Sequence, residues 1–465
     1  MEVLGIILSL FLLMFFAYRG FSVILFAPVF ALLAASMSGL PLMPAYTELF
    51  MAKAVTYVKS FFPVFMLGAV FGKVMEDTGL AKSIAHAIIQ SLGKERAILS
   101  VVLACAVLTY GGVSLFVVVF AVYPFAASLF KEADIPKRLI PGSIALGSFT
   151  FTMDAFPGTP QIQNIIPTNF FGTNIYAAPI LGLIGGSTIF VLGMMWLEHR
   201  RKKAQAAGEG YGSHTLNEPE IKDEANLPSW QVAILPLLTV LAVNFVMTRI
   251  FNWDPNLLKA FQAMKLPLVA PAVKNVIGIW SLIIALVCGI TLAVVLGFNR
   301  LPKGGLAKAL NAGAIGSLLA IMNTASEVGY GNVVASLSGF KQISSALMNI
   351  KVGGSPLVSE AVTVNILAGI TGSASGGMSI ALDLMAKDWL AWASSIGLSP
   401  EVLHRVASMA SGGMDTLPHN GAVITLLAVC GLTHKDSYPD IFAMTIIKTF
   451  MVFVIIALHT LTGIL

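Results

Sequence analysis

The chain has 465 residues, of which 57% are apolar and 11% are charged, and its formal net charge is +5. Soluble domains usually carry about 25% charged residues, whereas runs of about 20 apolar residues, long enough to span a bilayer, recur along this chain. The composition therefore excludes a soluble globular protein and predicts an all-α polytopic membrane protein. The positive charge is then a topology signal of cytoplasmic loops and does not indicate a nucleic-acid partner.

The pattern of apolar spans in residues 1–198 predicts a first structural unit. In chain order we expect apolar spans at about 3–18, 21–40 and 54–75, an amphipathic segment near 80–92, two arms at about 97–110 and 115–130, a broken span at about 139–170 and a span at about 176–197. The two arms are short for full spans, and Tyr-Gly-Gly-Val-Ser joins them without a polar loop. This pattern predicts a re-entrant helical hairpin, whose irregular tip a bilayer tolerates only inside protein or beside a watery cavity.

Residues 199–228 predict a cytoplasmic linker, and residues 229–465 predict a second unit. The linker begins with a basic cluster, and its Gly/Glu-rich part, 204–228, is expected to be mobile. In the second unit we expect spans near 230–250, 276–298 and 308–335, a hairpin at about 357–392, a broken span at about 402–432 and a last span at about 441–463.

The two units match at a constant offset. Asp154 and Asp415 occupy the same motif, Met-Asp-x-(Phe/Leu)-Pro, 261 residues apart (415 − 154). The same offset relates Gly68 to Gly329, Ser83 to Ser344, Gly111 to Gly372 and Ser114 to Ser375. Each copy makes five crossings, one of them a broken helix, plus one hairpin that returns to its own side. Five is odd, so we predict two inverted-topology repeats, as in secondary transporters.

The distribution of basic residues fits this topology. If the linker is cytoplasmic, most Lys and Arg fall in loops predicted inside, whereas the outside loops at 41–48 and 171–175 carry none. The exception is the stretch 249–275, which we interpret as an interfacial helix. It contains Arg249, Lys259, Lys265 and Lys274.

The two aspartates are the first candidates for function. An aspartate at mid-membrane costs on the order of 3 kcal/mol by insertion scales. Asp154 and Asp415 therefore line a central site in our interpretation, where they carry a coupling proton, coordinate Na⁺ or hold a substrate hydroxyl. The alternative is helix capping, because Asp before a new helix start is a good N-cap.

The breaks and hairpin tips also place helix N-termini at membrane depth, where free N–H groups and the helix dipole favour an anion. Glycines there let backbone approach a ligand, and Ser, Thr and Asn side chains donate hydrogen bonds. The alternative is small-residue helix packing. The predicted substrate-binding residues are Gly111, Gly112, Ser114, Gly158, Thr159, Gly372, Ser373, Ser375, His419 and Asn420.

Other ionisable residues lie inside or beside the spans. His419 suits proton coupling or pairing with an anion, or it is a hydrogen-bonded structural histidine. Glu327 is either a third proton-coupling group or an interface residue; its Ser-Glu-Val-Gly-Tyr-Gly context does not make a potassium filter, which needs four copies around an axis. Glu360 and Asp383 are expected near the surface, and Lys448 is expected to snorkel. The cysteines, Cys105, Cys288 and Cys430, are odd in number and indicate neither disulfides nor a metal site.

The whole chain resembles the gluconate permease family of the ion transporter superfamily. The two Met-Asp-x-x-Pro breaks, the Gly-Ser-Ala-Ser-Gly-Gly tip and the run from Met414 to Val423 carry the resemblance, and within the family the chain is more similar to the hydroxybutyrate permease branch. The resemblance implies a proton-coupled importer of small hydroxy-carboxylates in the bacterial inner membrane. It maps the glycines and serines of both tips, with Asp154 and Asp415, onto the family's central site.

The resemblance also implies a division of labour. A scaffold that forms a homodimer comprises about 1–75, 176–197, 229–335 and 441–463, and transport parts comprise about 97–170 and 357–432. Relatives in the wider superfamily use Ser-Asn-Thr tips to bind Na⁺. This chain has Gly-Gly-Val-Ser and Gly-Ser-Ala-Ser instead, which favours a proton.

The leading hypothesis is therefore a secondary active transporter, not an enzyme, that works by elevator-like alternating access. It carries a small hydroxy-monocarboxylate of the 3-hydroxybutyrate or gluconate type together with a proton and needs no cofactor. The alternatives are sodium-coupled symport, an intramembrane aspartyl protease with Asp154 and Asp415 as its dyad, and a passive channel. No Gly-x-Gly-Asp motif accompanies either aspartate, which disfavours the protease.

Overall fold

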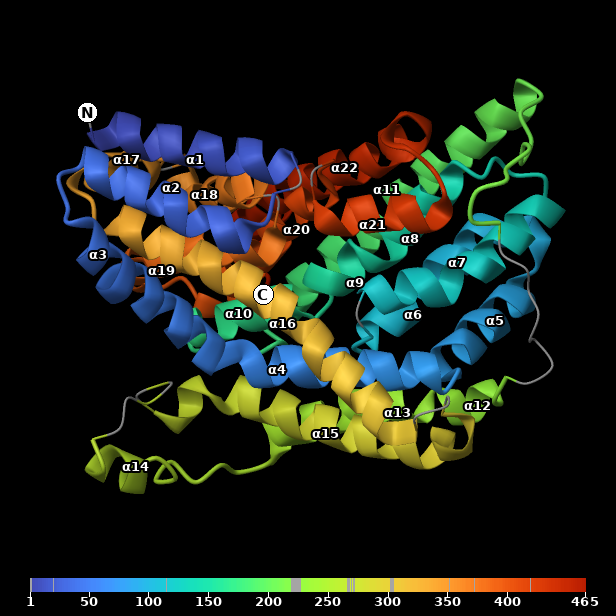
Figure 1. The fold of residues 1–465 in the computed structure, drawn as a ribbon, viewed down its shortest axis with the longest axis horizontal. Helices are drawn as coiled ribbons and strands as arrows, with labels where there is room; N and C mark the ends of the chain where they lie inside the picture. Colours follow the sequence, from blue (N-terminus) through green and yellow to red (C-terminus); the bar gives the residue numbers. More distant parts are fainter. Residues whose placement is uncertain are drawn as a thin grey trace.

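The computed structural model describes residues 2–19, 21–113, 115–218, 227–265, 268, 270, 272–301, 305–350, 352–371, 373–418 and 420–465, and all regular structure within them is helical (Figure 1). An unpaired backbone group costs several kcal/mol in hydrocarbon, and a helix satisfies these groups within one segment. The apolar runs therefore fold as helices.

The first half contains α1 (Glu2–Tyr18), α2 (Val23–Met37), α3 (Leu42–Pro44), the π-helical η1 (Ala45–Met51), α4 (Ala52–Asp77), α5 (Leu80–Leu92), α6 (Ala97–Tyr110), α7 (Leu115–Glu132), α8 (Leu139–Ser148), α9 (Phe151–Asp154), α10 (Ile162–Phe171) and α11 (Pro179–Ala206). One expectation is wrong. Residues 41–48, expected as a loop, begin a continuous helix over Leu42–Asp77, because their prolines, Pro41 and Pro44, stand at its start, where a missing N–H costs little.

The second half contains α12 (Trp230–Ala233), α13 (Leu235–Phe245), the π-helical η4 (Val246–Ile250), α14 (Lys259–Ala263), α15 (Ile277–Gly297), α16 (Gly305–Ala335), α17 (Ser338–Met348), α18 (Leu357–Thr371), α19 (Ala374–Ser395), α20 (Pro400–Gly413), the 3₁₀ turn η8 (Met414–Thr416), α21 (Gly421–Cys430) and α22 (His434–Thr462). The helices α18–α22 repeat the order of α6–α11. The helix α17, which our sequence analysis missed, lies where the predicted repeat places a counterpart of α5. Opposite insertion of the halves stays a prediction.

The expected interfacial helix at 249–275 is wrong for most of its length. Among the described residues of this stretch only α14, five residues long, is α-helical, and Pro255 interrupts the chain before it. The α14 segment stands away from the body (Figure 1) and exposes Leu257, Phe261 and Met264.

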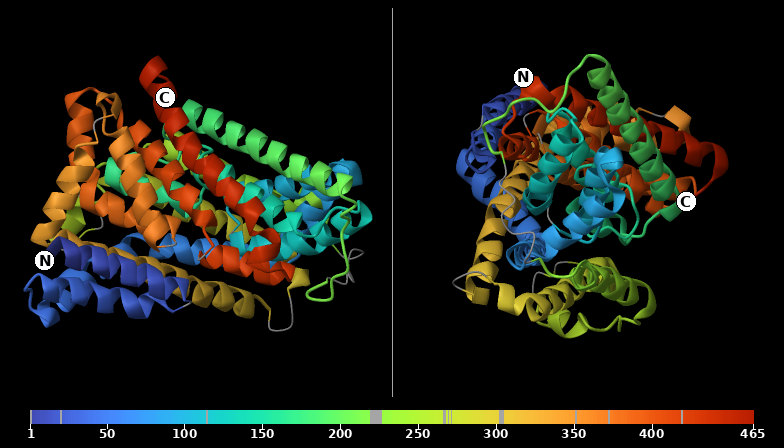
Figure 2. Two further views of the ribbon diagram at one scale, coloured as in Figure 1. Left: turned by 90° about the horizontal axis from the view of Figure 1, so that it is seen from above. Right: turned by 90° about the vertical axis from the view of Figure 1, so that its right-hand side faces the viewer.

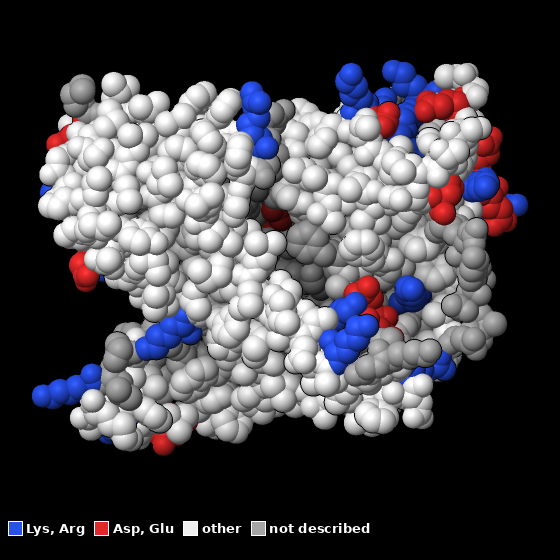
Figure 3. Space-filling view, in the orientation of Figure 1, with Lys and Arg blue, Asp and Glu red and all other residues white. Residues whose placement is uncertain are grey.

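Six helices among the described residues are long and apolar enough to cross a membrane. They are Leu42–Asp77, Pro179–Ala206, Trp230–Ile250, Ile277–Arg300, Gly305–Ala335 and His434–Thr462. Figure 3 shows one face that is largely uncharged, with charged side chains gathered where α11 ends and the linker begins. This distribution fits apolar walls in contact with lipid and a charged aqueous end.

The helices α4 and α16 pack along each other and cross the middle of the molecule (Figure 1). The helix α4 also packs against α15, and α16 packs against α2, so each central helix contacts the other half of the chain. The hairpin α6–α7 lies toward one end and the hairpin α18–α19 toward the other, with α8, α9, α10 and α20 between them. Two further views show α11 and α22 side by side (Figure 2). The broken helices are therefore enclosed by both hairpins.

The linker residues 204–218 contact the body, and their expected mobility stays a prediction. The fully buried Lys137 ammonium lies 2.8 Å from Glu218 Oε1 and donates to Leu216 O at 3.2 Å. Asn217 Nδ2 donates to Ala428 O at 2.7 Å, which ties the linker to the end of α21. A buried ammonium needs an anion and acceptors, and Glu218 and Leu216 of the linker supply them here.

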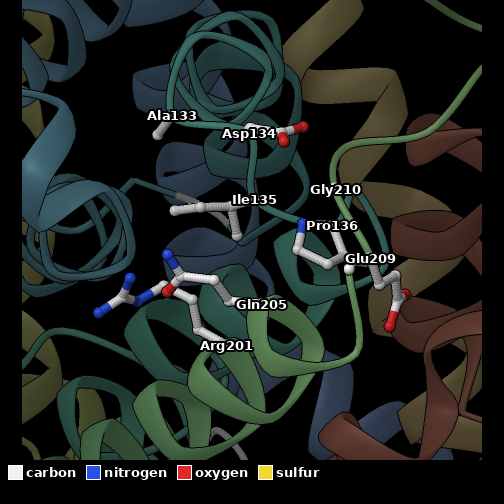
Figure 4. A pocket seen from close by; sticks show the side chains of 9 residues that line it. Ala133, Asp134, Ile135, Pro136, Arg201, Gln205, Glu209 and Gly210 are labelled. Carbon is white, nitrogen blue, oxygen red and sulfur yellow. The ribbon is translucent and has the colours of Figure 1, made fainter.

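A pocket lies beside this junction (Figure 4). Its lining consists of Ala133, Asp134, Ile135, Pro136, Arg201, Gln205, Gly208, Glu209 and Gly210. None of the predicted substrate-binding or proton-coupling residues belongs to this lining, so the pocket marks the linker junction and not the central site.

Replacing Glu218 with Gln should destabilise the protein, because it leaves the buried Lys137 without an anion. We expect a cost of about 2 kcal/mol and a lower melting temperature of the purified protein in detergent. The matched control is Glu198→Gln, whose partner Arg201 is 29% exposed; it should melt like the wild type. Equal melting of both variants would contradict the anchoring role of the linker.

Candidate functional site

The first break is built by prolines and one glycine. The helix α9 ends at Asp154 and α10 begins at Ile162. Pro157 and Pro160 lie between them and lack the N–H that a continuing helix needs. Gly158 has φ +86°, in the left-handed region that residues with a Cβ rarely adopt. The chain therefore leaves the helix inside the protein.

The tip of the first hairpin packs against this break. The Tyr110 hydroxyl donates to Pro157 O at 2.8 Å, and Gln161 Nε2 donates to Thr109 O at 2.7 Å. Gly112, at the tip, has φ +93°. The polar side chains of the hairpin and of the break thus satisfy the backbone carbonyls that each irregular segment leaves open.

Of the predicted residues in the first half, Gly111 and Gly112 lie at this tip and Gly158 and Thr159 in the break. A Cβ at Gly111 would overlap Leu237 of α13. The Thr159 side chain is buried, and its Oγ1 has no hydrogen-bond partner among the described residues. Ser114 lies outside the described residues.

The second break and hairpin tip carry two caps. The Gly376 N–H donates to Ser373 Oγ at 3.1 Å, so Ser373 caps α19. The Ala422 N–H donates to Asn420 Oδ1 at 2.7 Å, so Asn420 caps α21. Asn420 Nδ2 also donates to Asp415 Oδ1 at 2.8 Å. Asn420 therefore links the start of α21 to the Asp415 carboxylate, which lies in the same break.

The tip and the second break are neighbours. The Asp415 carboxylate lies beside the backbone N–H of Ala374, the first residue of α19. Ser375 Oγ lies 3.4 Å from Ser373 Oγ. Gly372 and His419 lie outside the described residues, so their predicted roles stay predictions.

An ion pair joins the two halves at the centre. Lys448 Nζ of α22 lies 2.5 Å from Asp154 Oδ2 and donates to Phe149 O at 2.8 Å. Gln163 Nε2 of α10 donates to Asp415 Oδ2 at 3.4 Å. The structure therefore brings both breaks together, and each aspartate contacts a residue from the other half.

This arrangement corrects the expected position of Lys448. Its side chain is 1% exposed and does not reach the membrane surface. The reason is tertiary: the Asp154 carboxylate and the open Phe149 carbonyl at the end of α8 offer an anion and an acceptor inside the protein, so the ammonium gains nothing by snorkelling.

Arg405 of α20 is a site residue that our sequence analysis missed. Its guanidinium is fully buried and donates to the backbone carbonyls of Asp154 at 3.1 Å and Ala177 at 2.7 Å. It also donates to Asn164 Oδ1 at 3.1 Å, which His404 Nε2 contacts at the same distance. The available signal was an arginine inside an expected apolar span. Arg405 satisfies the Asp154 carbonyl at the first break and the Ala177 carbonyl just before α11.

The remaining acidic residues lie apart from the ion pair. Glu327 is buried, and its carboxylate lies so close to Gly376 that a Cβ there would overlap it. Glu360 is 0% exposed, which corrects its expected place near the surface, and neither carboxyl oxygen has a hydrogen-bond partner among the described residues. Asp383 is partly buried and pairs with Lys53 at 2.6 Å.

The described residues contain no group of three His, Cys, Asp or Glu side chains that could hold a metal ion. The central site is instead a balanced cluster in which the cations Lys448 and Arg405 meet the anions Asp154 and Asp415. Chemically, such a cluster can bind a small anion, exchange a proton or hold the broken helices together.

Replacing Gly412 with Ala should disrupt the centre. A Cβ at this position would overlap the Asp154 carboxylate and lie 2.5 Å from Lys448 Nζ. Overpacking costs about 1–3 kcal/mol, so we expect a lower melting temperature and lost transport. The matched control is Gly316→Ala, also within a helix, where a Cβ meets no atom within 4 Å. A Gly412→Ala protein that melts and transports like this control would show that the close approach is unimportant.

Replacing Asp154 with Asn should cost about 3–5 kcal/mol, because it leaves the Lys448 ammonium buried without its anion. The double variant Asp154→Asn/Lys448→Met should recover part of the lost stability without recovering transport. Melting curves of the single and double variants measure this coupling. If the second substitution adds to the damage, the two charges do not stabilise each other.

Comparison of the sequence with known proteins shows the family of this chain. The model described as "GntP family permease" matches residues 1–462. A relative from Bacillus subtilis (strain 168), the uncharacterized transporter YxjC, is 54% identical over 480 aligned residues that cover 100% of each chain.

Two solved structures are similar in fold. The YdaH transporter of Alcanivorax borkumensis has a TM-score of 0.53 and 14% identity, over 88% of this chain and 87% of that one. The MtrF protein of Neisseria gonorrhoeae, described as illuminating a class of antimetabolite efflux pumps, has a TM-score of 0.55 and 14% identity, over 89% and 83%. At this identity the likeness concerns the fold alone, and that fold is one that transporters use.

Proposed function

The chain belongs to the GntP permease family, and on this basis we propose that it is a secondary active transporter that carries a small hydroxy-monocarboxylate together with a proton. It is a multi-pass integral membrane protein of a transporter family and not an enzyme. The bacterial inner membrane fits its Bacillus relative.

The observation that carries the proposal is the arrangement of the two helix breaks and the two hairpin tips. Each break lies beside one tip, and the two breaks meet at buried charged side chains. Asp415 lies beside the N-terminus of α19 and contacts Gln163 of the first half, and Asp154 pairs with Lys448. Irregular backbone at membrane depth is tolerated where it lines a cavity or is buried in protein. Broken helices whose termini meet at one point are the form that many secondary transporters give to a binding site.

Unsatisfied polar atoms favour a hydroxy acid as the substrate. Gln163 Oε1 is a buried acceptor and Thr159 Oγ1 a buried hydroxyl, and neither has a hydrogen-bond partner among the described residues. A substrate hydroxyl can donate to the first and accept from the second, whereas its carboxylate suits helix N–H groups and the nearby cations. A carboxylate without a hydroxyl leaves these atoms unsatisfied, which costs about 1–3 kcal/mol each.

The ion pair also bears on the elevator-like movement. The helices α11 and α22, assigned to the scaffold by resemblance, pack against α8, and α22 supplies Lys448 to Asp154. A buried pair that broke in every cycle would cost about 3–5 kcal/mol each time. We therefore propose that α11 and α22 move with the hairpins and broken helices. The rest of the scaffold stays in place and forms the homodimer contact.

The alternative functions find less support. An aspartyl protease needs two carboxylates that share a proton, but the Asp154 carboxylate contacts Lys448, and the Asp415 carboxylate is held by Asn420 and Gln163. Sodium coupling remains the alternative within the transporter class. A passive channel is the remaining alternative, and the transport assay below separates it from a carrier.

Purified protein in proteoliposomes should accumulate 3-hydroxybutyrate or gluconate when the outside is acidic, and a protonophore should abolish the accumulation. Counterflow should accelerate exchange, which a channel does not do. Asp154→Asn and Asp415→Asn should lose both accumulation and exchange, since each carboxylate holds the site together. Accumulation driven by a sodium gradient but not by a pH gradient would overturn proton coupling, and full uptake by both variants would remove their role.

A further inference from the structure

We propose that Glu327 carries the coupled proton: its carboxylate occupies the N-terminus of α19 as an internal anion, and the substrate anion binds there only when Glu327 is protonated. The inference rests on the proposed proton symport and assigns one of three candidate carboxylates to it. It makes Asp154 and Asp415 positioning residues of the site.

The geometry places Glu327 at the tip of the second hairpin. Glu327 belongs to α16, and a Cβ at Gly376, in the first turn of α19, would overlap its carboxylate. The carboxylate also lies beside Ser373, the cap of α19. Its Oε2 has no hydrogen-bond partner among the described residues, although the side chain is 2% exposed. A buried, unsatisfied carboxyl oxygen is therefore aimed at the start of a 22-residue helix.

The described surroundings of Glu327 supply no cation that pairs with it. On α4, Tyr57 is the titratable group that faces it, and on α19 the nearest charged residue, Asp383, is two turns away and pairs with Lys53 of α4. The helix α2, which also packs against α16, has no ionisable side chain. Glu48, on η1, is exposed. Within the described residues no Lys or Arg pairs with Glu327, whereas Asp154 is already neutralised by Lys448.

Asp154 is paired with a cation and Glu327 is not, and this difference makes Glu327 the carboxyl better suited to exchange a proton. An ionised carboxylate without a cation is costly to bury, whereas its protonated form is a neutral hydrogen-bond donor. The dipole of α19 partly compensates the ionised form. Both forms of Glu327 therefore have a source of stabilisation at this position. Protonating Asp154 instead would break an ion pair and leave an unpaired ammonium.

The N-terminus of α19 already has the Asp415 carboxylate beside Ala374, and each further anion there is costly, because like charges within about 4–6 Å repel. An ionised Glu327 therefore opposes the binding of a substrate carboxylate at Ser373 and the first N–H groups of α19. When Glu327 takes a proton, it becomes neutral and leaves that dipole to the substrate. Proton binding and anion binding then favour each other, and by linkage each raises the affinity for the other equally.

The position of Glu327 also links its proton exchange to the movement of the second hairpin. Glu327 lies on α16, which packs against α4 and α2, whereas Gly376 and Ser373 belong to the hairpin that we propose to move. Movement of the tip uncovers the carboxyl, so the proton is taken up and released only when the site is open. The proton bonds to a carboxylate oxygen on uptake and leaves to water on release, and no other reactant is needed.

The test is the variant Glu327→Gln, which mimics the protonated side chain. In wild-type protein the affinity for 3-hydroxybutyrate or gluconate, measured by thermal shift at several pH values, should rise about tenfold per unit fall in pH while one proton is coupled. In Glu327→Gln it should not change with pH. In proteoliposomes the variant should keep counterflow exchange and lose accumulation driven by a pH gradient.

The matched control is Glu360→Gln, because Glu360 is also a buried carboxyl, with neither oxygen hydrogen-bonded among the described residues, but lies near the start of α18, away from the tip. It should keep both exchange and accumulation. Glu327→Asp retains a carboxyl and should keep a pH-dependent affinity; if Glu327→Gln fails to fold, a pH-independent affinity in folded Glu327→Asp would overturn the inference.

Two negative results are distinguishable. If wild-type protein exchanges substrate but never accumulates it in a pH gradient, the proposed proton symport is wrong. If wild-type protein accumulates substrate and Glu327→Gln does so equally, with the same pH dependence of affinity, the symport stands and the role of Glu327 is wrong. Equal loss in Glu360→Gln would also overturn the assignment to the hairpin tip.

Discussion

The pair formed by Asp154 and Lys448 is the contact on which the centre of this protein depends. Two opposite charges, 0% and 1% exposed, lie 2.5 Å apart where a broken helix of the first half meets the last helix of the second. In surroundings of low dielectric neither charge is tolerable alone, so the pair holds the two halves in one register. Gly412 shows how close the approach is, because a Cβ there would overlap the carboxylate.

The irregular segments around this pair satisfy one another. The broken helix leaves carbonyls at Phe149 and Asp154 without partners in their own helix, and Lys448 and Arg405 donate to them. A bilayer supplies no water to such groups. Lys448 and Arg405 therefore have two roles: they compensate buried negative charge, and they donate hydrogen bonds to backbone carbonyls that the helix breaks leave open. This explains why buried cations lie beside the broken helices.

Two carboxylates approach α19 from different parts of the molecule. Asp415 comes from the neighbouring broken helix, and Glu327 comes from the long helix α16 that crosses the middle. A helix N-terminus attracts anions whether they belong to the protein or to a substrate. An internal carboxylate at such a site can control substrate binding. When the carboxylate is protonated, its negative charge is lost and it no longer repels a substrate anion.

The sequence by itself determined the helical class, the bounds of both hairpins, the two breaks at Asp154 and Asp415 and the resemblance to the permease family that the comparisons confirm. These features are local: apolar length, proline and glycine act within a few residues of the chain. Only the tertiary structure decided that Lys448 turns inward, that Arg405 braces the first break, that the linker to residue 218 is anchored and that Glu327 meets Gly376. Each of these contacts joins residues far apart in the chain, and the physical reason is that a buried charge takes whichever partner the packing of helices brings within reach, which no sequence window contains.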